Sequence, residues 1–247
     1  MDSPAKSILI LGAGSDIGRA VARRFAREGW RIDLAARNFD QARRDIDDIA
    51  TRSGQVPSAL PFDALEMVSY ASFIDGLPSL PDVVVSMIGL LGDQKRAASD
   101  PAHAIAVMRS NYEGPAVILG MFAERFAARG SGVIVGVSSV AGDRGRASNY
   151  VYGSAKAGFT AFLSGLRNAM ARKNVHVVTV KPGFVRTRMT AGMKLPAALT
   201  AEPDEVAEAI HRAVLGRRDI VYVRSIWRLI MLVIRAIPEA IFKKLSL

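Results

Sequence analysis

The arrangement of short apolar runs along the chain is the feature that most constrains its fold. Runs rich in Val, Ile and Ala alternate with stretches of helical periodicity. The expected strands are residues 7–11, 31–36, 56–61, 83–86, 133–138, 175–180 and 220–223. The expected helices are residues 17–28, 41–51, 66–75, 101–129, 150–173 and 203–215. This alternation predicts an α/β chain with a single-domain, doubly wound Rossmann fold, in which helices cover both faces of a seven-stranded parallel sheet.

The composition favours one large domain with no disulfide. The chain has 247 residues, and half of them are hydrophobic, which is enough for a full core. We predict one domain over residues 1–223 and a basic, amphipathic C-terminal extension over residues 224–247. The absence of cysteine excludes a catalytic thiol and a thiolate metal site. Because the three histidines lie far apart in the sequence, we predict no metal site.

A glycine-rich loop follows the first expected strand and opens the first expected helix. Gly12, Gly14 and Gly18 have the spacing G-x-G-x-x-x-G. Glycines in this context allow a tight turn and let backbone N–H groups approach a pyrophosphate at the positive end of a helix. We therefore predict a dinucleotide-binding loop. It also contains Ser15, Asp16 and Ile17.

The residues after the second and third expected strands bear on the choice of cofactor. No carboxylate stands at the end of the second strand, where an NAD enzyme would hold the ribose 2′-OH, and Arg37 occupies that region instead. A guanidinium suits a 2′-phosphate, so NADP(H) is favoured and NAD(H) remains possible. Alternatively, Arg37 stacks over adenine or is solvated. Asp63 could accept a hydrogen bond from the adenine amino group, or serve only as a loop cap.

A tyrosine and a lysine four residues apart share one face of the expected helix 150–173. An ammonium group beside the phenol of Tyr152 would favour the phenolate, so Lys156 could bring the phenol toward a working pKa. The pair could also be an exposed aromatic ring over a lysine stem. Tyr150 lacks such a partner, because Ser154 stands four residues after it.

Several motifs in order resemble the classical short-chain dehydrogenase/reductase family, over residues 7–223. They are the loop Gly12/Gly14/Gly18, Asn111, Ser138-Ser139 at the end of the fifth strand, Tyr152-x-x-x-Lys156 and Pro182-Gly183. The resemblance implies an NAD(P)-dependent oxidoreductase that acts on CH–OH groups, with residues 1–223 as its cofactor-binding domain.

The resemblance also implies roles for the motif residues. Tyr152 would be the general acid that protonates the substrate carbonyl oxygen, and Lys156 would lower its pKa and bind the nicotinamide ribose. Ser139 would orient the carbonyl, and Asn111 would hold a water in the proton relay. The residues expected along the nicotinamide are Pro182, Gly183, Val185 and Thr187.

One stretch departs from the family pattern. Where the family usually has Asn-Asn-Ala-Gly after the fourth strand, this chain has Ser86-Met87-Ile88-Gly89. Gly89 keeps the close approach to the cofactor, but other bonds must replace those of the asparagines.

A narrower resemblance is to the reductase half of the decaprenylphosphoryl-ribose 2′-epimerase system. It is carried by residues 89–93, 138–144, 149–156, 185–189 and 237–245. The resemblance implies a reductase of a lipid-phosphate-linked 2-keto pentose that acts with a membrane flavin oxidase. The alternatives are a 3-ketoacyl-carrier-protein reductase or other short-chain ketoreductase, and a non-catalytic, cofactor-binding scaffold for a membrane oxidase.

Two segments would then decide the substrate and the location of the protein. Residues 184–200 lie just past the end of a strand, so we expect a lid there. The longest uncharged stretch of the C-terminal segment, residues 229–234, is far too short to span a bilayer. The basic, amphipathic residues 226–237 suit a membrane surface, or packing against the same domain or a second subunit. Because the first strand begins at Ser7, we expect no signal peptide and a cytoplasmic protein, peripheral on the inner face of the membrane. We also expect a homo-oligomer, and no nucleic-acid partner.

Overall fold

The computed structural model describes residues 5–38, 43–53 and 56–245 and contains a seven-stranded sheet in the order β3-β2-β1-β4-β5-β6-β9. All neighbouring strands are parallel. The strands are β1 Ser7–Leu11, β2 Arg31–Ala36, β3 Ser58–Pro61, β4 Val83–Ser86, β5 Gly132–Val137, β6 Val175–Lys181 and β9 Ile220–Tyr222. The predicted doubly wound α/β fold is therefore confirmed.

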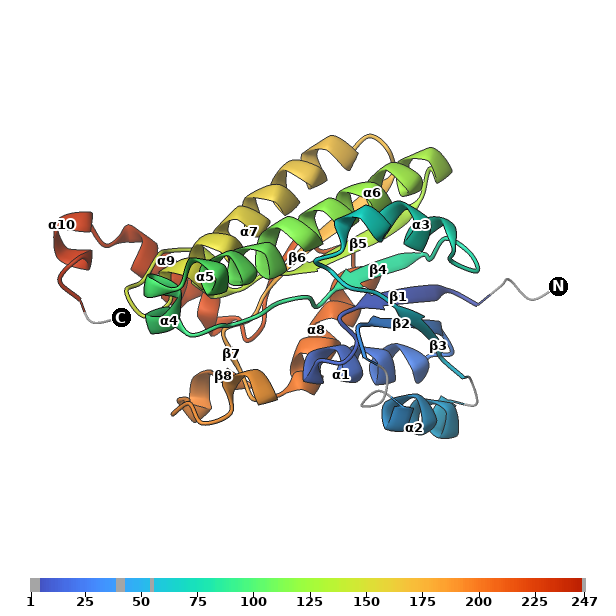
Figure 1. Ribbon diagram of the computed structural model, residues 1–247, viewed down its shortest axis with the longest axis horizontal. Helices are drawn as coiled ribbons and strands as arrows, with labels where there is room; N and C mark the ends of the chain where they lie inside the picture. Colours follow the sequence, from blue (N-terminus) through green and yellow to red (C-terminus); the bar gives the residue numbers. More distant parts are fainter. Residues whose placement is uncertain (1–4, 39–42, 54–55, 246–247) are drawn as a thin grey trace.

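Helices cover both faces of this sheet (Figure 1). One layer is α1 Asp16–Ala26, α2 Arg43–Ser53 and α8 Pro203–Leu215, and the other is α3 Tyr70–Asp75, α5 Pro101–Met108, α6 Gly114–Arg129 and α7 Tyr150–Met170. Alternate residues of β1 enter different cores. Ile8 joins Phe25 of α1 in one core, whereas Leu9 joins Phe122 of α6 in the other. Burial on both faces explains why the strands are apolar throughout.

Four predicted elements keep both boundaries, the others shift, and the shift of β5 lies near the site. Strands β1, β2 and β4 and helix α8 begin and end where predicted. Residues 41–42 of the predicted second helix lie outside the described residues. Strand β5 ends at Val137, so Ser138 and Ser139 follow the strand instead of ending it. The reason is local: the Ser139 side chain caps a 3₁₀ turn over Val140–Gly142 and accepts a hydrogen bond from Ala141 N at 3.1 Å.

The prediction of one helix over residues 101–129 was wrong in one respect. A π-helical turn, Arg109–Glu113, separates α5 from α6. At its end the backbone of Gly114 lies so close to Ala64 that a Cβ there would be 2.3 Å from the Ala64 carbonyl oxygen. The turn contains Asn111, and π-turns are frequent at functional sites.

Two short helical features were not predicted as such. Helix α4, Gln94–Ser99, precedes α5 and is capped by the Asp93 carboxylate, which accepts from Arg96 N at 2.7 Å. The predicted helix 66–75 consists of a 3₁₀ turn, Met67–Ser69, followed by α3.

The segment predicted as a lid leaves the sheet after β6 and returns before α8. It begins with β7, Phe184–Val185, which pairs in parallel with β8, Thr200–Ala201. Two 3₁₀ turns, Arg188–Thr190 and Ala197–Leu199, lie between them. The small sheet therefore ties together the two ends of the segment.

The C-terminal residues form α9, Ile226–Ala236, and α10, Glu239–Phe242. Trp227 and Met231 on α9 are 4% and 1% exposed and pack against Val140. Arg144 fixes the end of α9. Its guanidinium donates to three backbone carbonyls, those of Ile234, Arg235 and Ile237.

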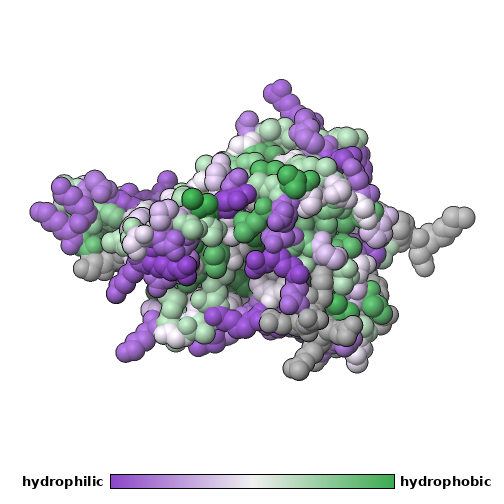
Figure 2. Space-filling view, viewed as in Figure 1, coloured by the Kyte–Doolittle hydropathy of each residue, from purple (hydrophilic) through white to green (hydrophobic). Residues whose placement is uncertain are grey.

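The outer face of α9 is apolar. Leu229, Leu232 and Val233 are 58%, 66% and 58% exposed. On the face shown in Figure 2, hydrophilic residues gather at the end of the molecule where α10 lies. Among the residues that the structure describes, no helix combines the length and the hydropathy that crossing a bilayer requires.

Candidate active site

Two adjoining cavities lie at the carboxyl ends of the strands. The first, the glycine-loop cavity, has a volume of about 480 Å³ and is lined by Gly12, Gly14, Ser15, Arg37 and Asp63, among others. The second, the Tyr152 cavity, has a volume of about 170 Å³ and is lined by predicted site residues from five segments, including Ile17, Asn111, Ser139, Tyr152, Lys156, Pro182, Gly183, Val185 and Thr187. Both are lined by Met87, Ile88 and Gly89. The sheet thus brings nearly all predicted residues to one cleft.

The glycine loop fits a dinucleotide. At Gly12 φ is +85°, and a Cβ would lie 3.2 Å from backbone atoms of Met87 and Ile88, so glycine is required there. Around Gly14 an added Cβ would meet nothing within 4 Å, which leaves the loop open on that side. Ser15 caps α1 by accepting from Gly18 N at 3.0 Å. An open loop at the start of a helix offers N–H groups to a pyrophosphate.

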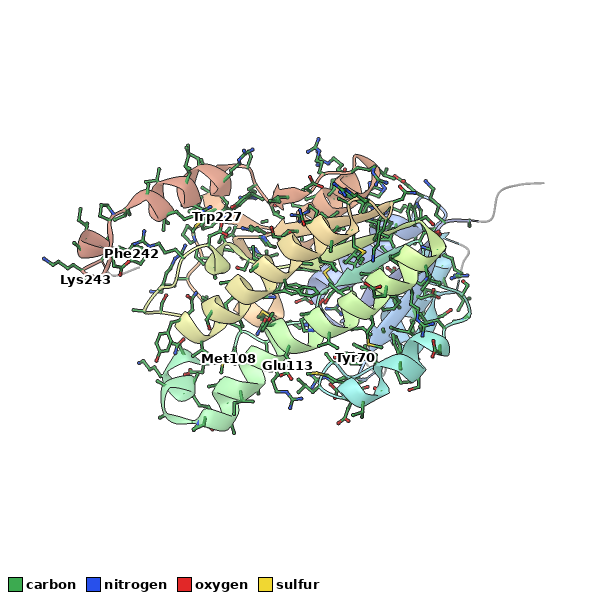
Figure 3. All side chains as sticks on the ribbon, turned by 90° about the horizontal axis from the view of Figure 1, so that it is seen from above. Tyr70, Met108, Glu113, Trp227, Phe242 and Lys243 are labelled. Carbon is green, nitrogen blue, oxygen red and sulfur yellow. The ribbon has the colours of Figure 1, made fainter. Side chains whose placement is uncertain are left out.

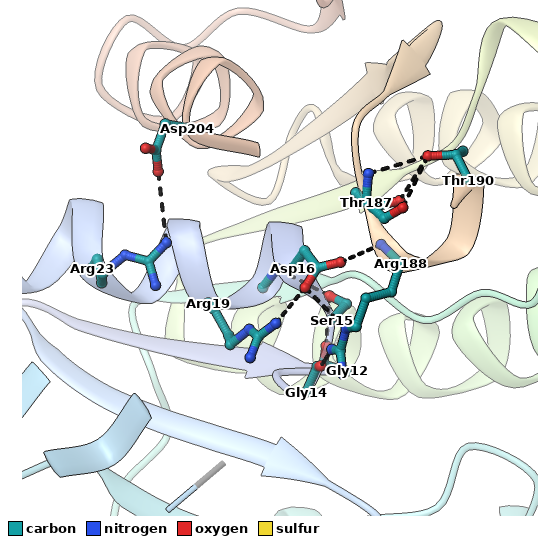
Figure 4. A network of polar contacts seen from close by, with 11 residues as sticks. Gly12, Gly14, Ser15, Asp16, Arg19, Arg23, Thr187, Arg188, Thr190 and Asp204 are labelled. Carbon is teal, nitrogen blue, oxygen red and sulfur yellow. Dashed lines mark hydrogen bonds and ion pairs between the residues drawn. The ribbon is translucent and has the colours of Figure 1, made fainter. Parts of the chain in front are cut away.

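Two predicted cofactor residues line neither cavity. Gly18 packs inside the loop, where a Cβ would be 2.9 Å from the Gly12 carbonyl oxygen. Asp16 instead contacts the predicted lid (Figure 4). Its carboxylate accepts from Arg188 N at 2.6 Å and Arg188 Nε at 3.1 Å, and it also pairs with Arg19. Burial raises the pKa of Asp16, but the hydrogen bonds and charges of Arg188 and Arg19 outweigh burial and hold the pKa below its ordinary value.

Arg37 and Asp63 both line the glycine-loop cavity and follow β2 and β3. Asp63 Oδ1 accepts from Leu65 N at 2.9 Å, so this carboxylate does cap its loop. Both side chains nevertheless line the cavity. Arg37 thus lies at the end of β2, in the region where the sequence predicted it.

Ser139, Tyr152 and Lys156 share the Tyr152 cavity. Lys156 is 4% exposed, and its Nζ donates to the Val137 carbonyl at 3.1 Å and lies 5.8 Å from the centroid of the Tyr152 ring. Burial raises the pKa of Tyr152 to about 12, and a hydrogen bond with Ser139 opposes that shift. Burial also lowers the pKa of Lys156 to about 8. The pKa of Tyr152 is therefore raised, with desolvation of the phenol as the largest cause, whereas the sequence led us to expect a lowered value.

Asn111 is fully buried and ties the π-turn to the loop after β4. Its Nδ2 donates to the Leu90 and Val107 carbonyls at 2.6 and 2.8 Å, and its Oδ1 accepts from Leu90 N at 3.3 Å. A Cβ on Gly89 would lie 2.8 Å from this Oδ1. These bonds brace the loop that lacks the usual asparagines. Ser138 joins the end of β5 to α7, since its Oγ donates to the Lys156 carbonyl at 3.0 Å.

Comparison with known proteins identifies the family. A model of the short-chain dehydrogenase family matches residues 6–196. An uncharacterized oxidoreductase of Mycobacterium tuberculosis is 35% identical over 247 residues, covering 99% of this chain and 98% of its own. The chain belongs to the short-chain dehydrogenase family. Its members are NAD(P)-dependent oxidoreductases.

Two further relatives carry more specific names. An acetoacetyl-CoA reductase of Allochromatium vinosum is 31% identical over 225 residues, which cover 83% of this chain and 89% of the relative. Among solved structures, a short-chain dehydrogenase from Sphingobium yanoikuyae in complex with NADPH superposes with a TM-score of 0.80. It is 21% identical, and the match covers 95% of this chain and 97% of that one, so it shows the shared fold.

The family match ends at residue 196, yet a later residue completes the Tyr152 cavity of this short-chain dehydrogenase. The Trp227 ring lies against Gly183, where a Cβ would be 2.0 Å from Trp227 Cε2. Its Nε1 donates to the Leu199 carbonyl at 3.1 Å, and its ring meets Phe184 edge-on at 5.5 Å. Sequence reasoning missed this role. The one signal in the sequence was that Trp227 lies in an apolar C-terminal segment, but this pattern is equally typical of a membrane contact.

Sequence reasoning also missed Arg146 and Asn149, which line the same cavity. Both lie between Ser139 and Tyr152. Nothing in the sequence distinguishes Arg146 from nearby Arg144, although the structure gives the two arginines different environments.

Proposed function

We propose that this protein is an NAD(P)H-dependent ketoreductase that converts a ketone to a secondary alcohol. The observation that carries the proposal is that Ser139, Tyr152 and Lys156 line one cavity, and that this cavity adjoins the glycine-loop cavity at Gly89. The nicotinamide cofactor, when bound, supplies a hydride. The chain itself must bind the cofactor, orient the ketone and provide a proton.

The environment of Tyr152 suits a proton donor. With a pKa of about 12, the phenol keeps its proton near neutral pH and donates it to a carbonyl oxygen that gains negative charge. The Ser139 hydroxyl is a second donor that orients this oxygen. Lys156, with a pKa of about 8, is mostly charged near neutral pH and stabilises the phenolate that remains.

NADPH absorbance with a panel of ketones tests this proposal. We expect consumption of NADPH by the wild type, and a loss of about 100-fold in kcat for Ser139→Ala. A panel that includes lipid-linked keto sugars and ketoacyl thioesters and yields no NADPH consumption would contradict the ketoreductase.

Arg37 favours NADPH over NADH in this proposal. A guanidinium at the end of β2 pairs with a 2′-phosphate, and the NADPH complex of the Sphingobium protein agrees with this choice. Arg37→Leu should lower kcat/KM for NADPH about tenfold or more and leave the value for NADH nearly unchanged. An equal loss for both cofactors would contradict the assignment.

For the substrate, we infer a lipid-phosphate-linked 2-keto pentose made by a membrane flavin oxidase. The support is the narrower sequence resemblance and an apolar lining of the Tyr152 cavity, to which Phe184, Met189, Met193 and Trp227 contribute. The decisive assay supplies the oxidase product and measures NADPH oxidation. Turnover of this ketone no better than that of unrelated ketones would contradict the assignment.

The exposed face of α9 supports a peripheral position on a membrane. Leu229, Leu232 and Val233 are exposed, and seven Lys and Arg residues fall within residues 217–247. Sedimentation with vesicles that contain anionic lipid should pull down the wild type, and changing the three residues to Ser should release it. Deletion of α9 would also remove the buried Trp227, so the three surface substitutions are the better test of membrane binding.

A second candidate is a 3-ketoacyl thioester reductase, which the similarity to an acetoacetyl-CoA reductase favours. A basic surface would also attract an acidic carrier protein. Acetoacetyl-CoA and a ketoacyl carrier protein separate the two candidates. Efficient turnover of either thioester would replace the keto-sugar assignment.

We further propose a homo-oligomer, with the partner on the exposed apolar side chains of α5 and α6. Ile105, Met108 and Val117 are 50%, 40% and 42% exposed (Figure 3 labels Met108). Light scattering should report a multiple of 26.5 kDa, and Val117→Asp should reduce it. A monomer at micromolar concentration would contradict this proposal.

A further inference from the structure

Arg146 is a partly buried cation in the Tyr152 cavity without a balancing carboxylate. Its Nη2 contacts Met231 Sδ at 3.3 Å. Its Nε is inaccessible to solvent and has no hydrogen-bond partner among the described residues. Burial lowers the pKa of Arg146, with partial compensation from Asp143. Buried guanidinium N–H groups normally have a hydrogen-bond partner, so the unpaired Nε–H of Arg146 needs an explanation.

The neighbouring carboxylates are engaged elsewhere. Asp143 accepts from Lys181 Nζ at 2.5 Å and from the Tyr222 hydroxyl at 2.8 Å. Glu239 pairs with Arg144 at 2.9 Å. Their charges are therefore matched by other cations, whereas the positive charge of Arg146 is only partly compensated, by the more distant influence of Asp143.

The contrast with Arg144, two residues earlier, shows what a structural arginine looks like in this chain. Arg144 donates to three backbone carbonyls and to Glu239, and its guanidinium lies 3.8 Å from the centroid of the Phe242 ring. Arg144 is thus satisfied by the protein. Arg146 keeps N–H donors that can bind a ligand.

Asn149 supplies an unsatisfied acceptor in the same cavity. Its Oδ1 is buried and has no partner among the described residues, and its side chain makes no capping bond to α7, although Asn149 is the N-cap. It stands three residues before Tyr152. A free donor and a free acceptor beside the catalytic tyrosine are the pattern of a site completed by a polar ligand.

Arg146 also lines a second hollow, on the side of the C-terminal segment. Phe242 and Lys243 of that segment line the same hollow. Figure 3 shows Phe242 and Lys243 at the same end of the molecule as Trp227, which lines the Tyr152 cavity. Arg146 therefore lies between the Tyr152 cavity and a hollow that also contains Lys243 and Glu239.

We propose that Arg146 and Asn149 form a binding site for an anionic group, a phosphate or a carboxylate, carried by the ketone substrate beside its reacting carbonyl. Arg146 pairs with the anion, and Asn149 accepts from a hydroxyl next to it. The proposal rests on the ketoreductase function and narrows its substrates to acidic ketones. Uncharged ketones would leave Arg146 unpaired and bind less tightly.

Fluorescence of Trp227 reports binding in this cavity. In a Trp30→Phe background Trp227 is the only tryptophan, and the protein is titrated in the presence of NADP⁺. Dihydroxyacetone phosphate is compared with dihydroxyacetone, and 2-keto-D-gluconate with D-fructose, so the two pairs separate a phosphate from a carboxylate next to the ketone. Inorganic phosphate serves as the minimal anion.

We expect at least one acidic sugar to bind about tenfold or more tightly than its uncharged counterpart. Arg146→Met should remove this difference, and Arg146→Lys should keep part of it, because lysine retains the charge but not the planar fork. The matched control is Arg125→Met, an exposed arginine paired with Asp75, which should leave the difference unchanged. Thermal melting should show no loss of stability for Arg146→Met.

The outcomes separate this site from the proposed function. Equal affinity for acidic and uncharged sugars, absence of binding by any of them, or an unchanged difference in Arg146→Met would overturn the anion site. A protein that binds an acidic sugar through Arg146 but never oxidises NADPH would contradict the ketoreductase and leave the site standing.

Discussion

Replacing Trp227 by Ala tests whether α9 is part of the structure that forms the active site. The side chain is 4% exposed, contacts Gly183 and Phe184, and donates a hydrogen bond to Leu199. Truncation of a buried tryptophan costs about 3–5 kcal/mol of folding free energy. Since domains are stable by about 5–15 kcal/mol, the variant should unfold at a clearly lower urea concentration.

Far-UV circular dichroism is the suitable probe, because the mutation removes a fluorophore. Leu232→Ala is the matched control, since Leu232 lies on the same helix but is 66% exposed, and its effect should stay within about 0.5 kcal/mol. Trp227→Ala should also enlarge the Tyr152 cavity and raise the relative kcat/KM of bulkier ketones. A wild-type urea midpoint in Trp227→Ala would refute the reasoning and make α9 an independent extension.

Three further changes have predicted outcomes. Contacts with Arg188 and Arg19 hold the pKa of Asp16 below its ordinary value in the folded state, so these contacts stabilise the fold above about pH 4 and are lost as pH falls further. Urea titrations should show a weaker dependence of stability on pH in that range for Asp16→Asn. Burial lowers the pKa of Lys156 from 10.5 to about 8, which means that burying the charged ammonium group opposes folding. Lys156→Met should therefore raise the urea midpoint of unfolding at neutral pH, while it abolishes activity. Gly12→Ala should cost more stability than Gly130→Ala, measured by thermal melting, because both have positive φ but only Gly12 faces neighbouring backbone; equal losses would contradict this.

The sheet was predictable because its strands are buried on both faces. Residues 8–11 of β1 are all apolar and 0% exposed, so the run stands out in the sequence. The break between α5 and α6 was not predictable from local sequence, and the close contact that accompanies it joins Gly114 to Ala64, which is far away in the sequence. Helical periodicity continues through a π-turn and hides it.

The candidate site divides in the same way. Local motifs predicted Ser139, Tyr152 and Lys156, because Tyr152 and Lys156 lie four residues apart on one helix and Ser139 lies in the turn directly after a strand. The contacts of Arg188 with Asp16 and of Trp227 with Gly183 join residues far apart in sequence, and no local pattern carries them. The direction of the Tyr152 pKa was also missed, because it depends on how deeply the phenol is buried.

The most direct test of the account is NADPH oxidation by Tyr152→Phe, compared with the wild type and with Tyr150→Phe. Tyr150 lies on the same helix and is 48% exposed, so it controls for loss of a phenol hydroxyl. NADPH binding is measured for each variant by titration. We predict that Tyr152→Phe loses about 100-fold or more of kcat while its NADPH affinity and the activity of Tyr150→Phe stay near wild type. Tyr152→Phe with wild-type turnover would contradict the assignment of Tyr152 as the proton donor.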